Sequence, residues 1–249
     1  MGIGDEIMCT GHVREMFARD QRKVRLDYGK RIWSEIFENN HKIAGLDEVG
    51  DFQVYRARVN GLRPYASVKT TTQWTWRDDY KPPVGEIFFE RYEIRWAERL
   101  QPNIVIEPNT KKLASPNKDW GWERWQELVR LINQGGLGAT QLGPMGTKRI
   151  SGAEFIETRT FRHAAAALAR AKAAVLPEGG LHHAAAAVGV RSVVIYGGYI
   201  SPQQTGYDMH VNLFTGGAPC GWRTKCRHCV DAMAKIEPAE VFEKLKALL

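Results

Sequence analysis

The sequence lacks any apolar run that approaches the roughly 20 residues needed to cross a bilayer. Its first residues also lack the charged segment and apolar core of a signal peptide. No internal repeat and no low-complexity linker interrupts the chain. We therefore expect a cytoplasmic protein that does not insert into a membrane.

Cysteine is scarce, with four residues at positions 9, 220, 226 and 229. Three of them cluster, which is not the spread of a secreted disulfide framework, so we expect reduced thiols. Cys220, Cys226, Cys229 and the intervening His228 offer enough ligands for zinc, and the Cys-x-x-Cys spacing is familiar. The sequence nevertheless contains no second Cys-x-x-Cys pair to complete a zinc site, so packing or ligand contact is the preferred interpretation of these residues. We expect no metal and no cofactor.

The composition favours a folded enzyme with an anionic partner. The 249 residues are 43% hydrophobic, which is enough for a substantial core. The formal charge of +7 and a pI near 9.3 suit nucleic acid, an anionic glycan or a phosphorylated ligand. An ordinary basic enzyme fits these values equally well.

From Asn103 onward, short apolar runs alternate with helical patterns, which predicts a doubly wound parallel α/β sheet. The expected strands are 104–107, 139–142, 155–157, 173–177 and 192–196, and the expected helices are 122–133, 162–172, 181–188 and 238–249. Ligands bind such sheets at the carboxyl ends of the strands. The loops at those ends are therefore the expected site.

Before residue 100 the signals are weaker, with a helix over 5–19, a strand at 24–27 and a helix near 32–39. The change near residue 100, from irregular sequence to alternating strands and helices, predicts two domains, 1–100 and 101–249. Trp74, Trp76 and Arg77 form a loop or edge strand that could stack on a base or sugar and bind the acceptor. A buried aromatic cluster is an equally good interpretation.

The segment 177–187 places Glu178, Gly179 and Gly180 between a strand and an alanine-rich helix. Glycines allow close approach of a ligand, and helix N-terminal N–H groups favour a diphosphate. Taken alone, a structural turn explains these residues better.

One segment resembles a motif of glycosyltransferase family nine, the heptosyltransferase-like enzymes. Its residues, in order, are Glu178, Gly179, Gly180, Leu181, His182 and His183. The resemblance extends over roughly 103–249, including 118–128, 141–144 and 161–175. It implies the GT-B fold, with two Rossmann-like domains of which the N-terminal one is reduced. It also implies that the closing helix 238–249 returns to the N-terminal domain.

The resemblance implies a set of residues that bind a nucleotide-diphosphate sugar. Lys118 is the phosphate candidate, and Glu178 could accept hydrogen bonds from ribose hydroxyls or cap its helix. Adjacent histidines project in different directions, so we expect only one, His183, to face the donor. The full expected donor set is Lys118, Gly143, Glu178, Gly179, Gly180, Leu181 and His183.

The N-terminal segment 2–8 is similar to the family's glycine and aspartate loop, which assigns Asp5 as general base and Gly4 to the acceptor site. A positioned carboxylate can take the proton of an attacking hydroxyl. Asp5 could equally cap a helix. The family places a strand before this loop, so either the start is truncated or the domain is reduced.

The expected activity is inverting glycosyl transfer to a polyanionic acceptor. No Asp-x-Asp motif is present, since Asp78 and Asp79 are adjacent, so metal-independent transfer is expected with Lys118 and backbone amides at the leaving group. The acceptor favoured slightly is 5-hydroxymethylcytosine in bacteriophage DNA, which requires an extruded base. Alternatives are heptosyl transfer to lipopolysaccharide, a sugar-nucleotide epimerase, or an inactive binding module. The sugar and the oligomeric state are not indicated.

Overall fold

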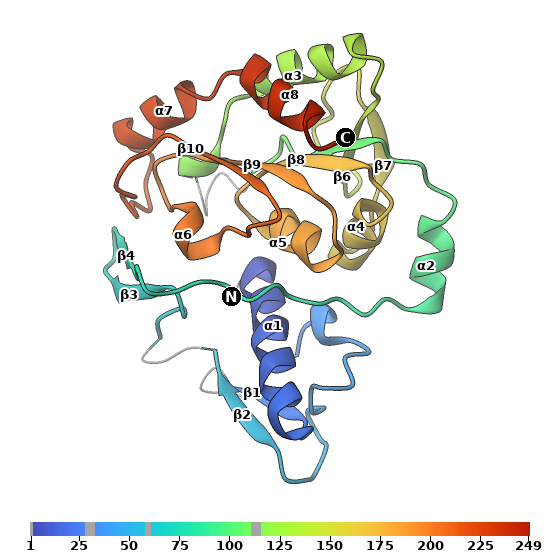
Figure 1. Ribbon diagram of the computed structural model, residues 1–249, viewed down its shortest axis with the longest axis vertical. Helices are drawn as coiled ribbons and strands as arrows, with labels where there is room; N and C mark the ends of the chain where they lie inside the picture. Colours follow the sequence, from blue (N-terminus) through green and yellow to red (C-terminus); the bar gives the residue numbers. More distant parts are fainter. Residues whose placement is uncertain (1, 28–32, 58–60, 111–115) are drawn as a thin grey trace.

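The computed structural model describes residues 2–27, 33–57, 61–110 and 116–249, and it is built around a six-stranded parallel sheet (Figure 1). The strand order is β10-β9-β8-β5-β6-β7. The strands are β5 (Ile104–Ile106), β6 (Ala139–Gly143), β7 (Glu154–Glu157), β8 (Ala173–Pro177), β9 (Ser192–Tyr196) and β10 (Val211–Phe214). Their register is parallel throughout. The expected α/β architecture is confirmed.

The chain changes direction across the sheet between β5 and β8. From β5 it adds β6 and β7 on one side, and then returns to add β8, β9 and β10 on the other. Such a switch point opens a crevice at the carboxyl ends of the two strands. All residues of β5 and β8 are buried, as expected for strands covered on both faces.

Helices cover both faces of this sheet (Figure 1). One face carries α3 (Trp122–Gln134), α7 (Arg227–Ala234) and α8 (Pro238–Lys246), and the other carries α4 (Phe161–Leu168), α5 (Gly180–Ala187) and α6 (Pro202–Thr205). The alanines of α4 and α5 are mostly buried, so both helices lie close to the strands. None of the helices in the described part of the chain combines the length and apolarity needed to cross a bilayer.

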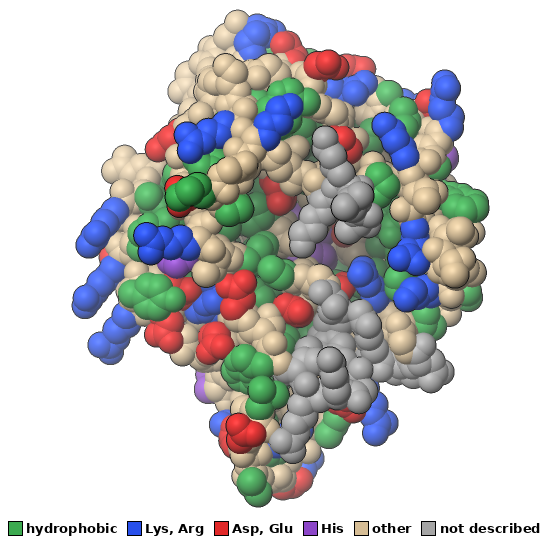
Figure 2. Space-filling model, turned by 180° about the vertical axis from the view of Figure 1, so that it is seen from behind, with side chains coloured by type: hydrophobic (Ala, Val, Ile, Leu, Met, Phe, Trp, Pro, Cys, Tyr) green, Lys and Arg blue, Asp and Glu red, His purple; other side chains and the backbone are tan. Residues whose placement is uncertain are grey.

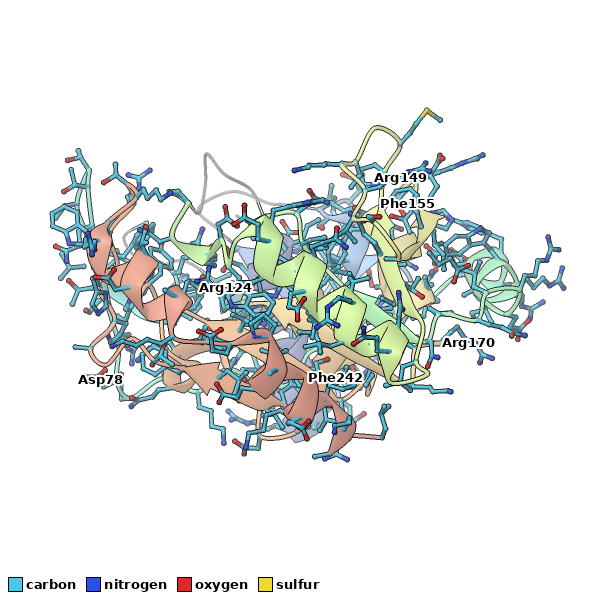
Figure 3. All side chains as sticks on the ribbon, turned by 90° about the horizontal axis from the view of Figure 1, so that it is seen from above. Asp78, Arg124, Arg149, Phe155, Arg170 and Phe242 are labelled. Carbon is cyan, nitrogen blue, oxygen red and sulfur yellow. The ribbon has the colours of Figure 1, made fainter. Side chains whose placement is uncertain are left out.

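Helix α8 is amphipathic as expected, but its packing corrects the expected return to the N-terminal domain. Val241, Leu245 and Leu248 are buried in the core beneath α3 and against β8 and β9. Figure 3 looks onto this face, where α3 and α8 lie side by side. At their contact, a Cβ on Gly135 would lie 2.6 Å from the ring of Phe242. The apolar stripe of α8 is fully used within the C-terminal half.

The N-terminal part is small and mixed. It contains α1 (Ile3–Asp20), a parallel pair of β1 (Val24–Asp27) and β2 (Gln53–Arg56), and an antiparallel hairpin of β3 (Ala66–Lys69) and β4 (Trp74–Trp76). The helix expected at 32–39 is a 3-10 turn, η1 (Glu35–Phe37), and residue 32 lies outside the described residues. The helix α2 (Arg91–Ala97) then leads to β5, and η2 (Pro116–Lys118) follows β5.

The two parts share one hydrophobic core. Ile7, Val13 and Val24 pack in the same cluster as Leu176 and Ala185, because α1 lies along α5. A buried ion pair adds to this contact: the guanidinium of Arg162, on α4, binds both carboxylate oxygens of Glu93, on α2, at 2.8 and 2.6 Å. Arg162 also donates to the carbonyls of Phe88 and Glu35. The division expected near residue 100 falls between α2 and β5, across this continuous packing.

Candidate functional site

The starts of two helices meet at the carboxyl end of the central strands. A Cβ on Gly4, in the first turn of α1, would lie 2.5 Å from Cδ2 of His183, in α5. A Cβ on Gly180 would lie 4.0 Å from the backbone nitrogen of Gly4 and 3.1 Å from the ring of Phe161. Glycine at both positions therefore allows the two positive helix ends to converge, which makes the junction suited to an anion.

Asp5 lies at this junction, and its side chain is only 6% exposed. One carboxylate oxygen, Oδ2, accepts a hydrogen bond of 3.1 Å from the backbone N–H of Gly2, which is a capping contact. The other, Oδ1, accepts a 2.5 Å hydrogen bond from the hydroxyl of Tyr65. Since a carboxylate offers about four lone-pair sites, Asp5 retains capacity to accept a further proton donor.

Arg63 and Tyr65 complete the surroundings of Asp5, and no pattern in the sequence indicated either residue. The Arg63 Nε lies 3.5 Å from Asp5 Oδ2, and its Nη1 donates to the Tyr65 hydroxyl at 2.7 Å. Burial, together with the charge of Asp5, raises the pKa of Tyr65 well above its ordinary value. Tyr65 therefore stays a hydrogen-bond donor to Asp5. Both residues fall in a segment without helical or strand periodicity, so they were not expected.

Lys118 and Glu178 meet across the switch point, in a close ion pair. Lys118 ends η2, after β5, and Glu178 directly follows β8, so adjacent parallel strands deliver both groups to one edge. Burial alone raises the pKa of Glu178, but the charge and the hydrogen bond of Lys118 lower it overall. The Lys118 ammonium also lies 5.4 Å from the ring centroid of Tyr199. The two residues expected in one site are thus brought together.

The adjacent histidines do not project apart as expected, since their ring centroids are 3.9 Å apart. His182 turns back toward its own helix start: Nε2 donates to the Thr205 carbonyl at 2.8 Å, which leaves Nδ1 to accept the Gly179 N–H at 2.9 Å. His183 forms a 2.7 Å hydrogen bond with the hydroxyl of Tyr207. Burial lowers the pKa of both histidines, so both are neutral at pH 7.

Two expected donor residues can act only through their backbones. Leu181 packs its side chain in the core shared with α1. Gly143 ends β6, where a Cβ would lie 2.6 Å from the Thr147 hydroxyl oxygen. First-turn N–H groups of an α-helix have no intrahelical partner. The Gly179 N–H is already bonded to His182, so Gly180 and Leu181 offer the amides that point from this helix start.

A comparison with family models gives a match to glycosyltransferase family 9 (heptosyltransferase) over residues 78–236, more than half of the chain. The chain belongs to glycosyltransferase family 9. That match spans both strand-end loops and Glu178, while Asp5 and Arg63 lie before it. The chain has no match among curated proteins.

Solved structures of glycosyltransferases have a similar fold at low sequence identity. The glycosyl transferase family 9 protein of Veillonella parvula is 13% identical with a TM-score of 0.67, covering 100% of this chain and 94% of that one. The iron-containing dodecameric glycosyltransferase TibC of enterotoxigenic E. coli is 14% identical with a TM-score of 0.69, covering 100% and 74%. The E. coli ADP-heptose lps heptosyltransferase II is 20% identical with a TM-score of 0.50, covering 68% of this chain. This family 9 chain spans 54% of that enzyme's length.

The aromatic segment expected to bind the acceptor is largely occupied by internal contacts. Trp76 is 8% exposed, and its indole N–H donates to the Tyr199 carbonyl at 2.8 Å. Arg77 forms an exposed ion pair with Asp79 at 2.7 Å. Trp74 is half-buried and stacks on Trp76 with ring centroids 6.1 Å apart. The buried-cluster interpretation is therefore correct for Trp76, while Trp74 is half-buried, with the Arg63 guanidinium and the Lys69 ammonium each 5.3 Å from its ring centroid.

The cysteine cluster is more organised than expected. The sulfur of Cys220 lies 3.3 Å from that of Cys229 and 3.7 Å from that of Cys226. Together with His228, these residues place one ligand atom each within 4.8 Å of one another. The expectation of packing or ligand contact assumed that the Cys-x-x-Cys pair had no second half, but the fold supplies it as Cys220 and His228. These four residues could hold a metal ion.

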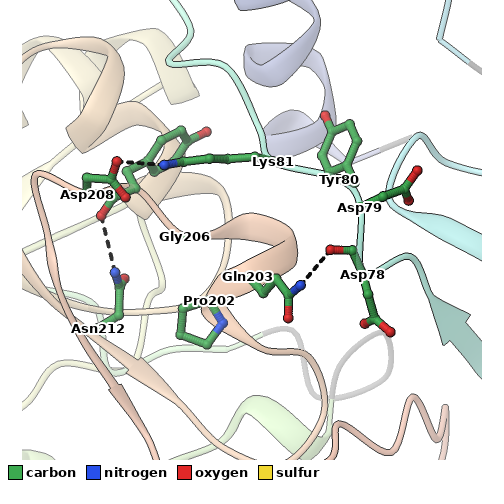
Figure 4. Close-up of a pocket in the computed structure, with 10 residues that line it drawn as sticks. Asp78, Asp79, Tyr80, Lys81, Pro202, Gln203, Gly206, Asp208 and Asn212 are labelled. Atoms are coloured by element: carbon green, nitrogen blue, oxygen red, sulfur yellow. Dashed lines mark hydrogen bonds and ion pairs between the residues drawn. The ribbon is translucent and has the colours of Figure 1, made fainter.

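A cavity of about 390 Å³ lies beside the junction, between segments 78–81 and 202–212 (Figure 4). Tyr207, the partner of His183, is part of its lining. Asp78, Asp79 and Asp208 also line it, and Asp208 pairs with Lys81 at 2.6 Å. Figure 2 shows a hollow near the middle of one face, with histidine visible inside and Lys and Arg along one side. The acidic lining of the cavity does not suit a polyanion.

Proposed function

We propose that this family 9 chain transfers a sugar from a nucleotide-diphosphate sugar to an acceptor hydroxyl. The observation that carries the proposal is the meeting of Lys118 and Glu178 at the switch point, beside the start of α5 and opposite Asp5 on α1. In open α/β sheets this crevice is where ligands bind. The E. coli relative is called an ADP-heptose enzyme, which makes a nucleotide-linked heptose the first donor to test.

The diphosphate of the donor is proposed to lie against the start of α5. The amides of Gly180 and Leu181 and the ammonium of Lys118 would neutralise the charge that develops on the leaving group. Glu178 is then available for ribose hydroxyls, since donor phosphates would compete for Lys118. Fixed charges of this kind act without a metal, so added Mg²⁺ or Mn²⁺ should not raise turnover.

Asp5 is proposed as the general base of an inverting displacement. The acceptor oxygen attacks the anomeric carbon as the bond to the diphosphate breaks, and its proton passes to the carboxylate. Tyr65 orients that carboxylate through Oδ1, and Arg63 lies against Oδ2, the oxygen that also accepts from Gly2. Gly4 has no side chain, and we propose that this leaves space for the acceptor substrate beside the Asp5 carboxylate.

The proposed acceptor is an anionic glycan. The basic net charge of +7 suits it, and the relative named for lipopolysaccharide supports it. Hydroxymethylated DNA has no comparable support. The DNA interpretation rested on the positive charge and on the aromatic, arginine-rich segment before residue 100, in which the Trp76 indole is bonded to the Tyr199 carbonyl and Arg77 pairs with Asp79 at the surface.

A transfer assay with mass detection tests this function. Purified chain is incubated with ADP-, UDP- and GDP-linked hexoses and heptoses, in three arms containing lipopolysaccharide core, hydroxymethylated DNA or no acceptor. Glycan-dependent release of nucleoside diphosphate is expected. Conversion of the donor sugar without acceptor would replace the proposal by an epimerase, and binding without any turnover would replace it by a binding module.

A further inference from the structure

We propose that Cys220, Cys226, Cys229 and His228 form a tetrahedral metal centre for zinc or ferrous iron that holds the β3–β4 hairpin and the Lys118 turn in place. The four ligand atoms lie within 4.8 Å of one another. Tetrahedral zinc with Zn–S bonds of about 2.3 Å separates its sulfur ligands by about 3.8 Å. The two sulfur separations, 3.3 and 3.7 Å, are close to this value.

The histidine is oriented as a ligand. Its Nε2 lies 2.6 Å from the Gly216 carbonyl, which can only accept, so Nε2 carries the proton and Nδ1 is free to bind. Metal-binding histidines typically donate their second N–H to a carbonyl or carboxylate in this manner. A Cβ on Gly198 would lie 2.5 Å from Nδ1, so glycine at this position leaves room for the ring.

The centre sits where three segments converge. Gln73 donates to the Cys220 carbonyl at 2.7 Å, and the Trp74 N–H donates to the Gly221 carbonyl at 2.9 Å. Arg223 returns hydrogen bonds to the carbonyls of Thr71 and Thr72, at 2.9 and 2.8 Å. The segment 220–226 thereby binds the hairpin through its backbone.

The same segment binds the residue before Lys118. Asn117 is 3% exposed, and its amide nitrogen donates to the carbonyls of Trp222 and Thr224 at 2.7 and 2.8 Å. Its amide oxygen accepts the Cys226 N–H at 3.0 Å. The segment 220–226 contains no helix or strand of its own, so a metal would add to these hydrogen bonds by joining its two ends, Cys220 and Cys226, to α7. The ion would act by positioning, at a place apart from the donor diphosphate.

Metal analysis of the purified full chain tests the centre directly. We expect about one zinc or iron per chain, the usual content of a closed four-ligand site, and mass spectrometry distinguishes the two metals. Cys226→Ser should lose most of the metal, whereas Cys9→Ala, a change to the one cysteine outside the cluster, should retain it. Absence of stoichiometric metal, a Cys220–Cys229 disulfide, or retention of metal by Cys226→Ser would each overturn the proposal.

The positioning role has its own readout. Removing the metal from the wild-type chain with a strong chelator should increase hydrogen exchange at 71–76 and 117–118, while α3 remains protected, and Zn²⁺ should restore protection. Co²⁺ loading should produce thiolate charge-transfer absorption, which does not depend on whether the Cys226 variant folds. Unchanged exchange in both segments after metal loss would reduce the centre to a bound ion without this role.

Discussion

Gly4 on α1 lies directly against the imidazole of His183 on α5, so close that one added methyl would overlap the ring. We predict that Gly4→Ala destabilises the chain by about 1–3 kcal/mol, the usual cost of overpacking, because His183 is also held by Tyr207. Denaturant unfolding measures the loss. Gly2→Ala is the matched control, since the nearest atom to a Cβ there is 3.9 Å away. Equal stability of the two variants would contradict the close approach.

Asp5→Asn should spare donor binding and lower turnover. The amide oxygen can still accept from the Gly2 N–H, and the amide NH2 can donate to the Tyr65 hydroxyl oxygen, so the fold is kept while basicity is lost. General base catalysis contributes on the order of 10²- to 10⁴-fold, so kcat should fall in that range. Glu6→Gln removes a charge from the same helical turn and serves as the control. A similar loss in both variants, or near-normal turnover of Asp5→Asn, would leave Asp5 as a helix cap.

Removing Lys118 should affect both stability and donor affinity. Lys118→Met leaves a buried carboxylate without its partner, at a cost of about 3–5 kcal/mol, because Glu178 is only 7% exposed. The double variant Lys118→Met, Glu178→Gln should recover much of the stability and none of the affinity for nucleoside diphosphate. Thermal unfolding and calorimetric titration separate the two effects. Recovery of affinity in the double variant would show that Lys118 acts only on Glu178.

Acid should destabilise the chain through its buried histidines. Burial lowers the pKa of His210 from 6.5 to about 4, so between these values the unfolded chain binds a proton that the folded chain does not. Stability is therefore complete above the unfolded pKa and falls as pH drops toward the folded pKa, by about 3 kcal/mol at most for this group. His210→Gln should flatten the dependence of unfolding free energy on pH between 6.5 and 4. An unchanged slope would contradict the assignment.

The C-terminal half was the predictable part of the fold. Its central strands, β5, β6, β8 and β9, are buried along their whole length and read as largely apolar runs, and its helices carry a regular apolar stripe, so both periodicities were visible in the sequence. The strand β4 was expected only as one of two alternatives, and its partner β3, the strand β10 and the helix α7 were not expected, because short or partly exposed elements depend on distant contacts such as that of Trp74 with Gly221. Local pattern cannot reveal those partners.

At the candidate site too, the residues that follow regular strands could be predicted, and those in irregular segments could not. Lys118 and Glu178 follow strands, and parallel neighbours deliver such residues to one edge, so their meeting could be foreseen. Arg63 and Tyr65 reach Asp5 from an irregular segment. The convergence of Cys220 with His228 depends on a turn between β10 and α7 whose path the sequence does not indicate.

The apolar cluster that joins Ile7 and Val13 of α1 to Leu176 and Ala185 has a consequence for how the molecule melts. Since neither half buries this surface alone, heating should not release one half while the other persists. A fragment beginning near residue 101 would carry the uncovered sides of α4 and α5 into water, together with an unpartnered Arg162 guanidinium. Self-association, rather than an independent folded unit, is the expected fate of such a fragment, and the full chain should melt in a single cooperative step.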